Sequence, residues 1–200
     1  MRSLCLACGT LLLSALSLTA HASPITYTDA VIASGSLNGV NFSNQLITIT
    51  GSADTNNIGS YLAGSIYEVT TVNPTLKVGS GPIVQITDDI IAVDNFGQPV
   101  AGFGDLTTSL FLMGTINPVF NGYTLNSPVT GTGFALFDSG FSYNTADGAL
   151  IISTVSGNST FTAAASVTST PEPSSILLLG TGLLGLAAAG RRKFASSLTV

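Results

Sequence analysis

The sequence predicts an all-β body, an antiparallel β-sandwich of jelly-roll-like or similar topology, between an N-terminal signal peptide and a single C-terminal transmembrane helix. Across residues 23–167 the apolar residues form short bursts, and no helical periodicity persists beyond a few residues. Turn dipeptides separate the bursts: Asn38-Gly39, Asn121-Gly122, Asp147-Gly148 and Gly157-Asn158. About ten short strands spaced by roughly 8–12 residues favour two packed sheets, with a closed sheet as the alternative.

The expected strands are of two kinds. Alternating apolar and polar residues predict strands with one solvent-facing side at residues 25–28, 46–50, 130–137 and 161–167. Short apolar runs predict more completely buried strands at residues 83–86, 90–93, 110–113 and 150–152. A hairpin is expected within residues 33–58, turning at Asn38-Gly39. The sequence contains no internal repeat, which disfavours a solenoid or a propeller.

Residues 1–22 have the anatomy of a secretory signal peptide. Arg2 precedes an apolar run whose last part is residues 11–18, and the small residues Ala20 and Ala22 follow it. Signal peptidase is therefore expected to cleave before Ser23. Cys8 lies ahead of the end of the apolar run, whereas a lipidated cysteine follows that run, so we do not expect a lipoprotein.

This cleavage determines which chemistry is left to the mature chain. Cys5, Cys8 and His21 all lie in the removed segment, and the chain has no tryptophan. Disulfides and Ser-His-Asp or Cys-His catalysis are therefore excluded from the mature protein. Its stability is expected to come from packing and backbone hydrogen bonds.

The charge of the body is strongly acidic. The whole chain has five basic and ten acidic residues and a formal net charge of -5. Between residues 23 and 170 the only cation is Lys77, and the acids are Asp29, Asp54, Glu68, Asp88, Asp89, Asp94, Asp105, Asp138 and Asp147. Such a surface cannot neutralise phosphates, so we do not expect nucleic-acid binding.

The C-terminal region divides into three parts: a linker at residues 168–173, an apolar segment at 174–190 and a basic tail at 191–200. As a helix the apolar segment would span about 26 Å, against roughly 30 Å for a bilayer core. It lacks the polar face of a core helix, so we expect a transmembrane helix. Arg191, Arg192 and Lys193 are expected to stay cytoplasmic, which places the body across the inner membrane.

The ordered arrangement of Pro171-Glu172-Pro173, a leucine- and glycine-rich helix and Arg191-Arg192-Lys193 resembles the PEP-CTERM sorting signal of exported Gram-negative bacterial proteins. The resemblance covers residues 170 to about 194. It implies processing by an exosortase, a membrane-embedded transpeptidase-like enzyme, in bacteria that also make extracellular polysaccharide. The tail at residues 194–200 is longer than in many such signals. Residues 33–58 loosely resemble the openings of other PEP-CTERM surface proteins.

The body offers little catalytic chemistry, and we expect that it is not an enzyme. A Ser-Lys pair would have to use Lys77, which no S-x-x-K motif precedes. Asp88 and Asp89 are the only adjacent carboxylates, but neighbours on a strand point to opposite faces, which does not suit glycoside hydrolysis. No catalytic, cofactor-binding or metal residue is assigned.

Calcium binding is a minor hypothesis. Residues 54–59 begin like a calcium loop, with Asp54 first and Gly59 sixth, but Ile58 and Ser65 occupy the fifth and twelfth positions, where ligands are needed. An Asx turn is the favoured interpretation. Asp88, Asp89 and Asp94 are the alternative cation ligands.

Aromatic side chains are the remaining candidates for ligand binding, since flat rings stack on sugars. Tyr61 and Tyr67 would face the same way on an uninterrupted strand, although Gly64 can interrupt it. For the aromatic residues around the Asp138-Ser139-Gly140 turn we favour packing in the core over sugar binding; these are Phe134, Phe137, Phe141 and Tyr143.

The sequence therefore predicts an exported protein of the cell surface or extracellular matrix, first held in the inner membrane, with a structural or adhesive role. The alternative is a carbohydrate- or Ca²⁺-binding module associated with exopolysaccharide. The expected partners are signal peptidase, an exosortase-like enzyme and extracellular polysaccharide.

Overall fold

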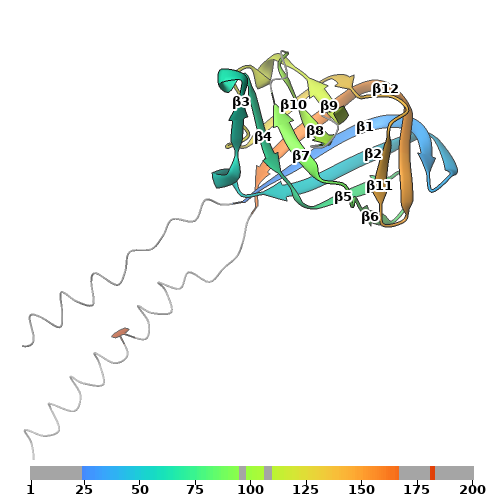
Figure 1. Ribbon diagram of the computed structural model, residues 1–200, viewed down its shortest axis with the longest axis horizontal. Coiled ribbons are helices and arrows are strands. Elements are labelled where there is room, and N and C mark those ends of the chain that lie inside the picture. Colours follow the sequence, from blue (N-terminus) through green and yellow to red (C-terminus); the bar gives the residue numbers. More distant parts are fainter. Residues whose placement is uncertain (1–23, 95–97, 106–109, 167–180, 183–200) are drawn as a thin grey trace, which may run out of the picture. The chain divides into compact units, whose positions relative to one another are not determined.

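The computed structural model describes residues 24–94, 98–105, 110–166 and 181–182. The body forms one compact unit, Ala22–Val167. Its described residues form strands and the short 3₁₀ helices η1 (Thr55–Asn57), η2 (Leu62–Gly64) and η3 (Pro118–Phe120), which confirms the all-β class (Figure 1). The strands are β1 (Ile25–Leu37), β2 (Val40–Ala53), β3 (Gly59–Tyr61), β4 (Ile66–Thr70), β5 (Val72–Val78), β6 (Ile83–Gln85), β7 (Ile90–Asp94), β8 (Val100–Asp105), β9 (Leu110–Ile116), β10 (Val129–Leu136), β11 (Ser142–Thr145) and β12 (Gly148–Ala165).

All the strands belong to one antiparallel sheet, so the expectation of two separate sheets is corrected. The strand order is β3-β4-β7-β8-β9-β10-β12-β1-β2-β5-β6. The remaining strand, β11, pairs with β12 and is not part of this linear order. Both halves of the sheet contribute to one core: Val69 and Phe103 come from the β4 to β9 half, and Ile49 and Leu76 from the half that contains β2 and β5. The sheet therefore folds over on itself to bury its apolar face, as a sheet of this breadth must.

The two longest strands hold the halves together. β12 pairs with β11 through Gly148–Ile151 and with β10 through Asn158–Ala163, while β1 runs beside it along both stretches. Gly157 has a φ of 76°, and the register with β1 shifts there. The turn predicted at Gly157-Asn158 is thus a bulge inside one strand, because β1 pairs with β12 on both sides of it.

The chain passes between the halves at two corners. At the first, Thr71 donates from its backbone N (3.0 Å) and its Oγ1 (2.7 Å) to the carbonyl of Ile90. At the second, Ile86 bridges to Thr145, and Thr87 N donates to the carbonyl of Asn144 over 2.9 Å. The bonds at the second corner connect the β6 end of the sheet to β11.

The core follows the alternation read from the sequence. On β1 the buried residues Tyr27, Asp29 and Val31 alternate with Thr28 and Ala30, which point outward. Tyr27 stacks with Phe161 at a centroid distance of 6.1 Å, and Phe120 meets Phe161 edge-on at 5.6 Å. A smaller cluster covers the other face of β7, so the strand predicted at residues 90–93 is buried on both sides, as expected.

Three of the predicted turns are present. At Asn121-Gly122, Gly122 has a φ of 69°, and Tyr123 N donates to the carbonyl of Phe120 over 3.1 Å. Asn38-Gly39 connects β1 to β2 with φ angles of 50° and 74°, as a tight hairpin of this type requires. The β11–β12 hairpin turns at residues 146–147, and Gly148 begins β12 with a φ of 123°. Both hairpins thus follow from local turn chemistry.

Candidate functional site

The sorting residues lie outside the described residues. This holds for Pro171, Glu172, Pro173, Arg191, Arg192 and Lys193, and for the signal-peptidase site Ala20, Ala22 and Ser23. Of the expected transmembrane segment at 174–190, only residues 181–182 are described, and they are helical. Among the residues that the structure describes, no helix is long and apolar enough to cross a membrane.

The body's two chain ends meet. Ile25 pairs with Ala165, and Ser166 N donates to the carbonyl of Pro24 over 2.7 Å. The hydroxyls of Thr26 and Ser166 are also 2.7 Å apart. The segments that join the body to both terminal regions therefore begin at the same point of the fold.

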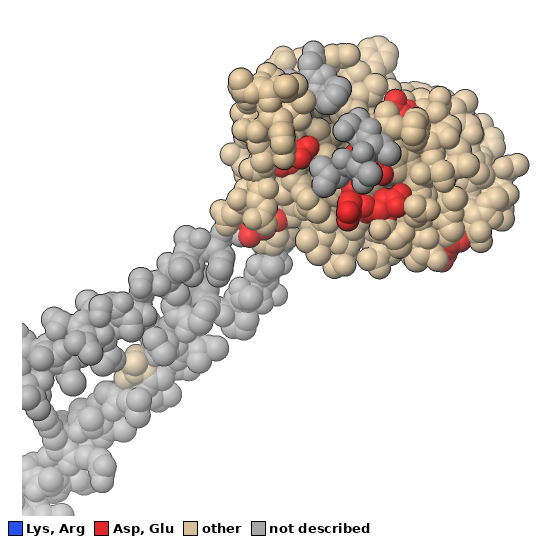
Figure 2. Space-filling view, in the orientation of Figure 1, with Lys and Arg blue, Asp and Glu red and all other residues tan. Residues whose placement is uncertain are grey.

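Carboxylates gather on one face of the body (Figure 2). Burial raises the pKa of the Tyr143 hydroxyl, and the charges of Asp138, Asp105 and Asp88 raise it further, so all three carboxylates lie near this ring. The Tyr143 side chain is almost fully buried, and its hydroxyl has no hydrogen-bond partner among the described residues. The three carboxylates are far apart in sequence, so spacing could not identify this cluster.

Two of these carboxylates hold the backbone in place. Asp88 accepts from the backbone N of Asn144 (2.6 Å) and from its Nδ2 (2.9 Å). Asp138 Oδ2 accepts from Phe111 N at 2.7 Å. Asp88 thus ties the corner between β6 and β7 to β11.

The predicted calcium loop is an Asx turn. Asp54 caps η1, and its Oδ1 accepts from Asn56 N at 2.9 Å. Of the alternative ligands, Asp89 is exposed, and the Asp94 side chain lies outside what the structure describes. Within the described part of the chain, no three carboxylate, histidine or cysteine side chains lie close enough together to hold a metal ion.

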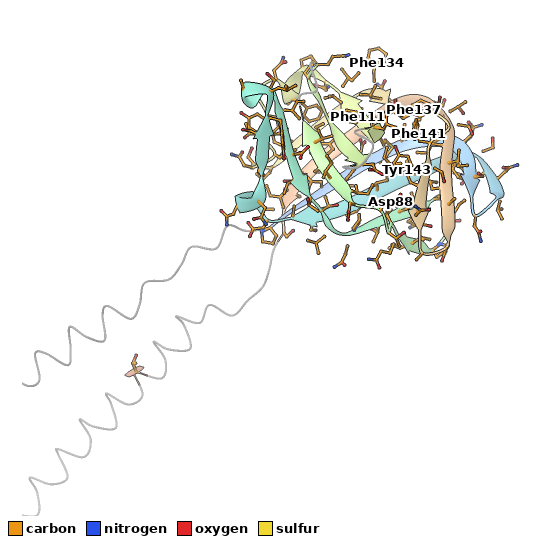
Figure 3. All side chains as sticks on the ribbon, viewed as in Figure 1. Asp88, Phe111, Phe134, Phe137, Phe141 and Tyr143 are labelled. Atoms are coloured by element: carbon orange, nitrogen blue, oxygen red, sulfur yellow. The ribbon has the colours of Figure 1, made fainter. Side chains whose placement is uncertain are left out.

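The aromatic residues near the 138–140 turn divide into two groups (Figure 3). Tyr143 is in the core, and Phe137 packs against it, as expected. Phe134 is 76% exposed and Phe141 is 43% exposed, so the expectation of core packing is wrong for these two rings. Tyr61 is on β3 and pairs with Ile66 of β4, so it does not share a strand with Tyr67.

One acid is buried in the core. Asp29 is fully buried on the inner face of β1, where its Oδ1 accepts from Thr115 Oγ1 at 3.1 Å. Thr115 Oγ1 also lies within hydrogen-bond distance of Ser159 Oγ, at 2.8 Å. Burial raises the pKa of Asp29 to about 8, although the hydrogen bonds from Thr115 and the Ala30 backbone lower it. Asp29 Oδ2 has no partner among the described residues.

The sequence analysis missed a regular array of threonines on the outer face of the sheet, which we call the threonine face. Thr-x-Thr motifs occur on four adjacent strands, and the buried residues between them show that the threonines point outward. In one row across the strands, Thr130 is opposite Thr162, Thr162 is opposite Thr28, and Thr28 is opposite Thr50. The face consists of Thr26, Thr28, Thr48, Thr50, Thr130, Thr132, Thr160 and Thr162.

The Thr-x-Thr motifs are visible in the sequence, but the order of the strands was needed to show that they lie side by side.

Neighbouring hydroxyls are paired across the strands. Thr132 and Thr160 hydroxyl oxygens are 2.9 Å apart, and those of Thr28 and Thr50 are 3.4 Å apart. Each hydroxyl can donate and accept, so such pairs keep hydrogen-bonding capacity toward the outside.

Comparison with known proteins assigns the C-terminal segment alone. Residues 169–193 match the family model of the PEP-CTERM protein-sorting motif. This confirms the resemblance of Pro171-Glu172-Pro173 and Arg191-Arg192-Lys193 to that signal, and the body has no family assignment. No curated protein and no solved structure matches the chain. The described body is all-β, and the chain carries a C-terminal PEP-CTERM sorting motif, which implies export and processing at a membrane.

Proposed function

We propose that the chain is an exported surface or extracellular-matrix protein delivered by an exosortase-type system. The observation that carries this proposal is the PEP-CTERM motif at residues 169–193. Signal peptidase cleaves before Ser23, which becomes the N-terminus. Residues 174–190 hold the precursor in the inner membrane, and the exosortase-like enzyme then processes the C-terminal segment. The mature body reaches the cell surface or the matrix.

The role proposed for the body is structural or adhesive rather than enzymatic. The mature chain has no imidazole or thiol to serve as a base or a nucleophile. Two of the three carboxylates near Tyr143, Asp88 and Asp138, accept hydrogen bonds from backbone N–H groups. The body is a single continuous sheet around one main core, and this architecture favours a stable structural module.

The sorting step is tested with two changes in the producing cells. Deleting the exosortase should leave a larger form of the protein in the inner membrane. Glu172→Ala should give the same larger form, because it removes the only carboxylate of the Pro171-Glu172-Pro173 motif. Membrane fractionation followed by immunoblotting measures both effects.

The matched control is Asp89→Ala, which removes an exposed carboxylate of the body and should leave sorting unchanged. Normal release of the protein after both the deletion and Glu172→Ala would contradict the proposed route.

A second candidate function is binding of carbohydrate or Ca²⁺, favoured by the exposed rings of Phe134 and Phe141. A glycan array probed with and without Ca²⁺ tests it. If the rings bind sugar, Phe134→Ala should remove the signal, while Val119→Ala, another exposed apolar change, should keep it. An array without signal in either condition would leave the structural or adhesive role.

A further inference from the structure

The threonine face has neighbours of a consistent kind. Thr75 on β5 extends the central row beyond Thr50. Ser52 is opposite Thr26 at one end of the face, and Val72 is opposite Ser52. Five strands, β10, β12, β1, β2 and β5, thus present hydroxyl and methyl groups in a repeating pattern.

Carboxylates are absent from this face among the described side chains. Asp29 is the one acid on β1, and it points into the core. The other acids whose side chains are described lie at the N-cap of η1, on β4 and β8, in the corner before β7 and in the turns that flank β11. The only cation of the body, Lys77, lies opposite Thr48 at the margin of the face. The surface of this acidic protein is therefore divided into an acidic part and one that lacks acids.

Exposed apolar side chains border the same face. Ile32 and Leu46 are opposite each other on β1 and β2, next to the threonine rows. Phe134 follows Thr132 on the outward side of β10, and Val72 and Ile83 lie toward the β5 and β6 margin. Exposed apolar groups collected on one face are typical of an interaction surface.

The dimensions suit a modest protein interface. Five strands about 4.8 Å apart and four rows about 6.8 Å apart outline roughly 500–600 Å². Two such faces in contact would bury roughly 1,000–1,200 Å², near the lower limit for specific complexes. Twisted sheets pack face to face with their strands about 30° apart, which is the arrangement expected for two copies of this face.

We propose that the threonine face binds the same face of a second copy, forming a two-fold symmetric dimer. Threonine hydroxyls are self-complementary because each one donates and accepts. Two acidic bodies repel each other, and the repulsion is smallest when they meet through a surface without carboxylates, so this face is the favoured contact. The charge on the remaining surface keeps the dimer weak at low salt and makes it stronger as salt screens the repulsion. This inference does not depend on the sorting route.

Chemical cross-linking in intact producing cells tests the contact directly. Thr28→Cys, at the centre of the face, is introduced into a chain in which Cys5 and Cys8 are serine. Facing sheets are about 10 Å apart, too far for a disulfide, so a short bismaleimide is the suitable reagent. Thr28→Cys should give a cross-linked dimer, and Thr87→Cys, on the exposed corner outside the face, should not. Equal cross-linking of the two variants, or cross-linking of neither, overturns the proposal.

Sedimentation velocity of the protein released from cells gives an independent measurement. Thr28→Lys with Thr162→Lys places like charges at the centre of the contact and should weaken the dimer at least about tenfold, while Thr87→Lys should not. Circular dichroism of the variants shows whether they remain folded. A wild-type protein that stays monomeric at every concentration and salt overturns the proposal. Monomers that bind a neutral glycan through the threonine face would assign this face to carbohydrate and overturn it as well.

Discussion

At the scale of single residues, Asp29 is the most unusual side chain of the body. It occupies a position on β1 where alternation calls for an apolar group, between Tyr27 and Val31. Thr115 of β9 hydrogen-bonds one of its oxygens, and Ser159 of β12 is hydrogen-bonded to Thr115 rather than to Asp29. Because Oδ2 has no partner among the described residues, the neutral acid is far easier to bury than the carboxylate.

This burial makes stability depend on pH. The pKa of Asp29 is about 8 in the folded protein and about 4 in an unfolded chain. Folding therefore favours the protonated form, and its stabilising effect is complete below about pH 4 and is lost as the pH rises through about 8. Asp29→Asn should remove this dependence and raise the free energy of unfolding at pH 8 by about 1–3 kcal/mol.

Urea unfolding at several pH values between 4 and 8 measures both effects. Asp89→Asn, a change of the same type at an exposed position, should keep the wild-type pH dependence. An equal slope in the wild type and Asp29→Asn would show that Asp29 is charged in the folded protein.

At the scale of elements, the long strands depend on irregular positions where the register shifts. Gly35 lies at such a shift on β1, between β2 and β12. A Cβ added there would collide with the carbonyl oxygen of Ile151 and lie 3.0 Å from the Phe42 ring. The absence of a side chain therefore allows β12 to approach β1.

Gly35→Ala should consequently lower the free energy of unfolding by about 1–3 kcal/mol, as overpacking of a close contact does. Ser36→Ala, the neighbouring position on β1, should change it by less than about 0.5 kcal/mol. Denaturant titration followed by circular dichroism compares the two variants. Gly35→Ala with wild-type stability would mean that β12 can move away without cost.

At the scale of the whole molecule, local patterns predicted the strands better than they predicted their association. The alternation at residues 25–28 and 46–50 correctly indicated β1 and β2, and Asn38-Gly39 located their turn. The strands β3, β4, β5, β8 and β11 were missed. Pro74 interrupts the apolar pattern of β5, and Gly102 interrupts that of β8. Gly157 resembled a turn because sequence alone does not reveal that β1 spans both sides of it.

The candidate sites differed in the same way. The sorting motif is a continuous stretch of sequence, so it could be found without a structure. The carboxylates around Tyr143 and the hydrogen bonds of Asp29 join distant segments, and these contacts became visible only with the fold. The threonine face needed both the repeated motif and the order of the strands.

The meeting of the body's two ends has a mechanical consequence. Ala165 ends β12, which is bonded to β1 on one side and, through Ala163, to β10 on the other. Because hydrogen bonds between antiparallel strands run perpendicular to them, a pull along the axis of β12 loads many bonds in shear at once. A body held by its C-terminal end in flowing water would resist such a pull with its longest strand pairing, and the force would not open the sheet one bond at a time.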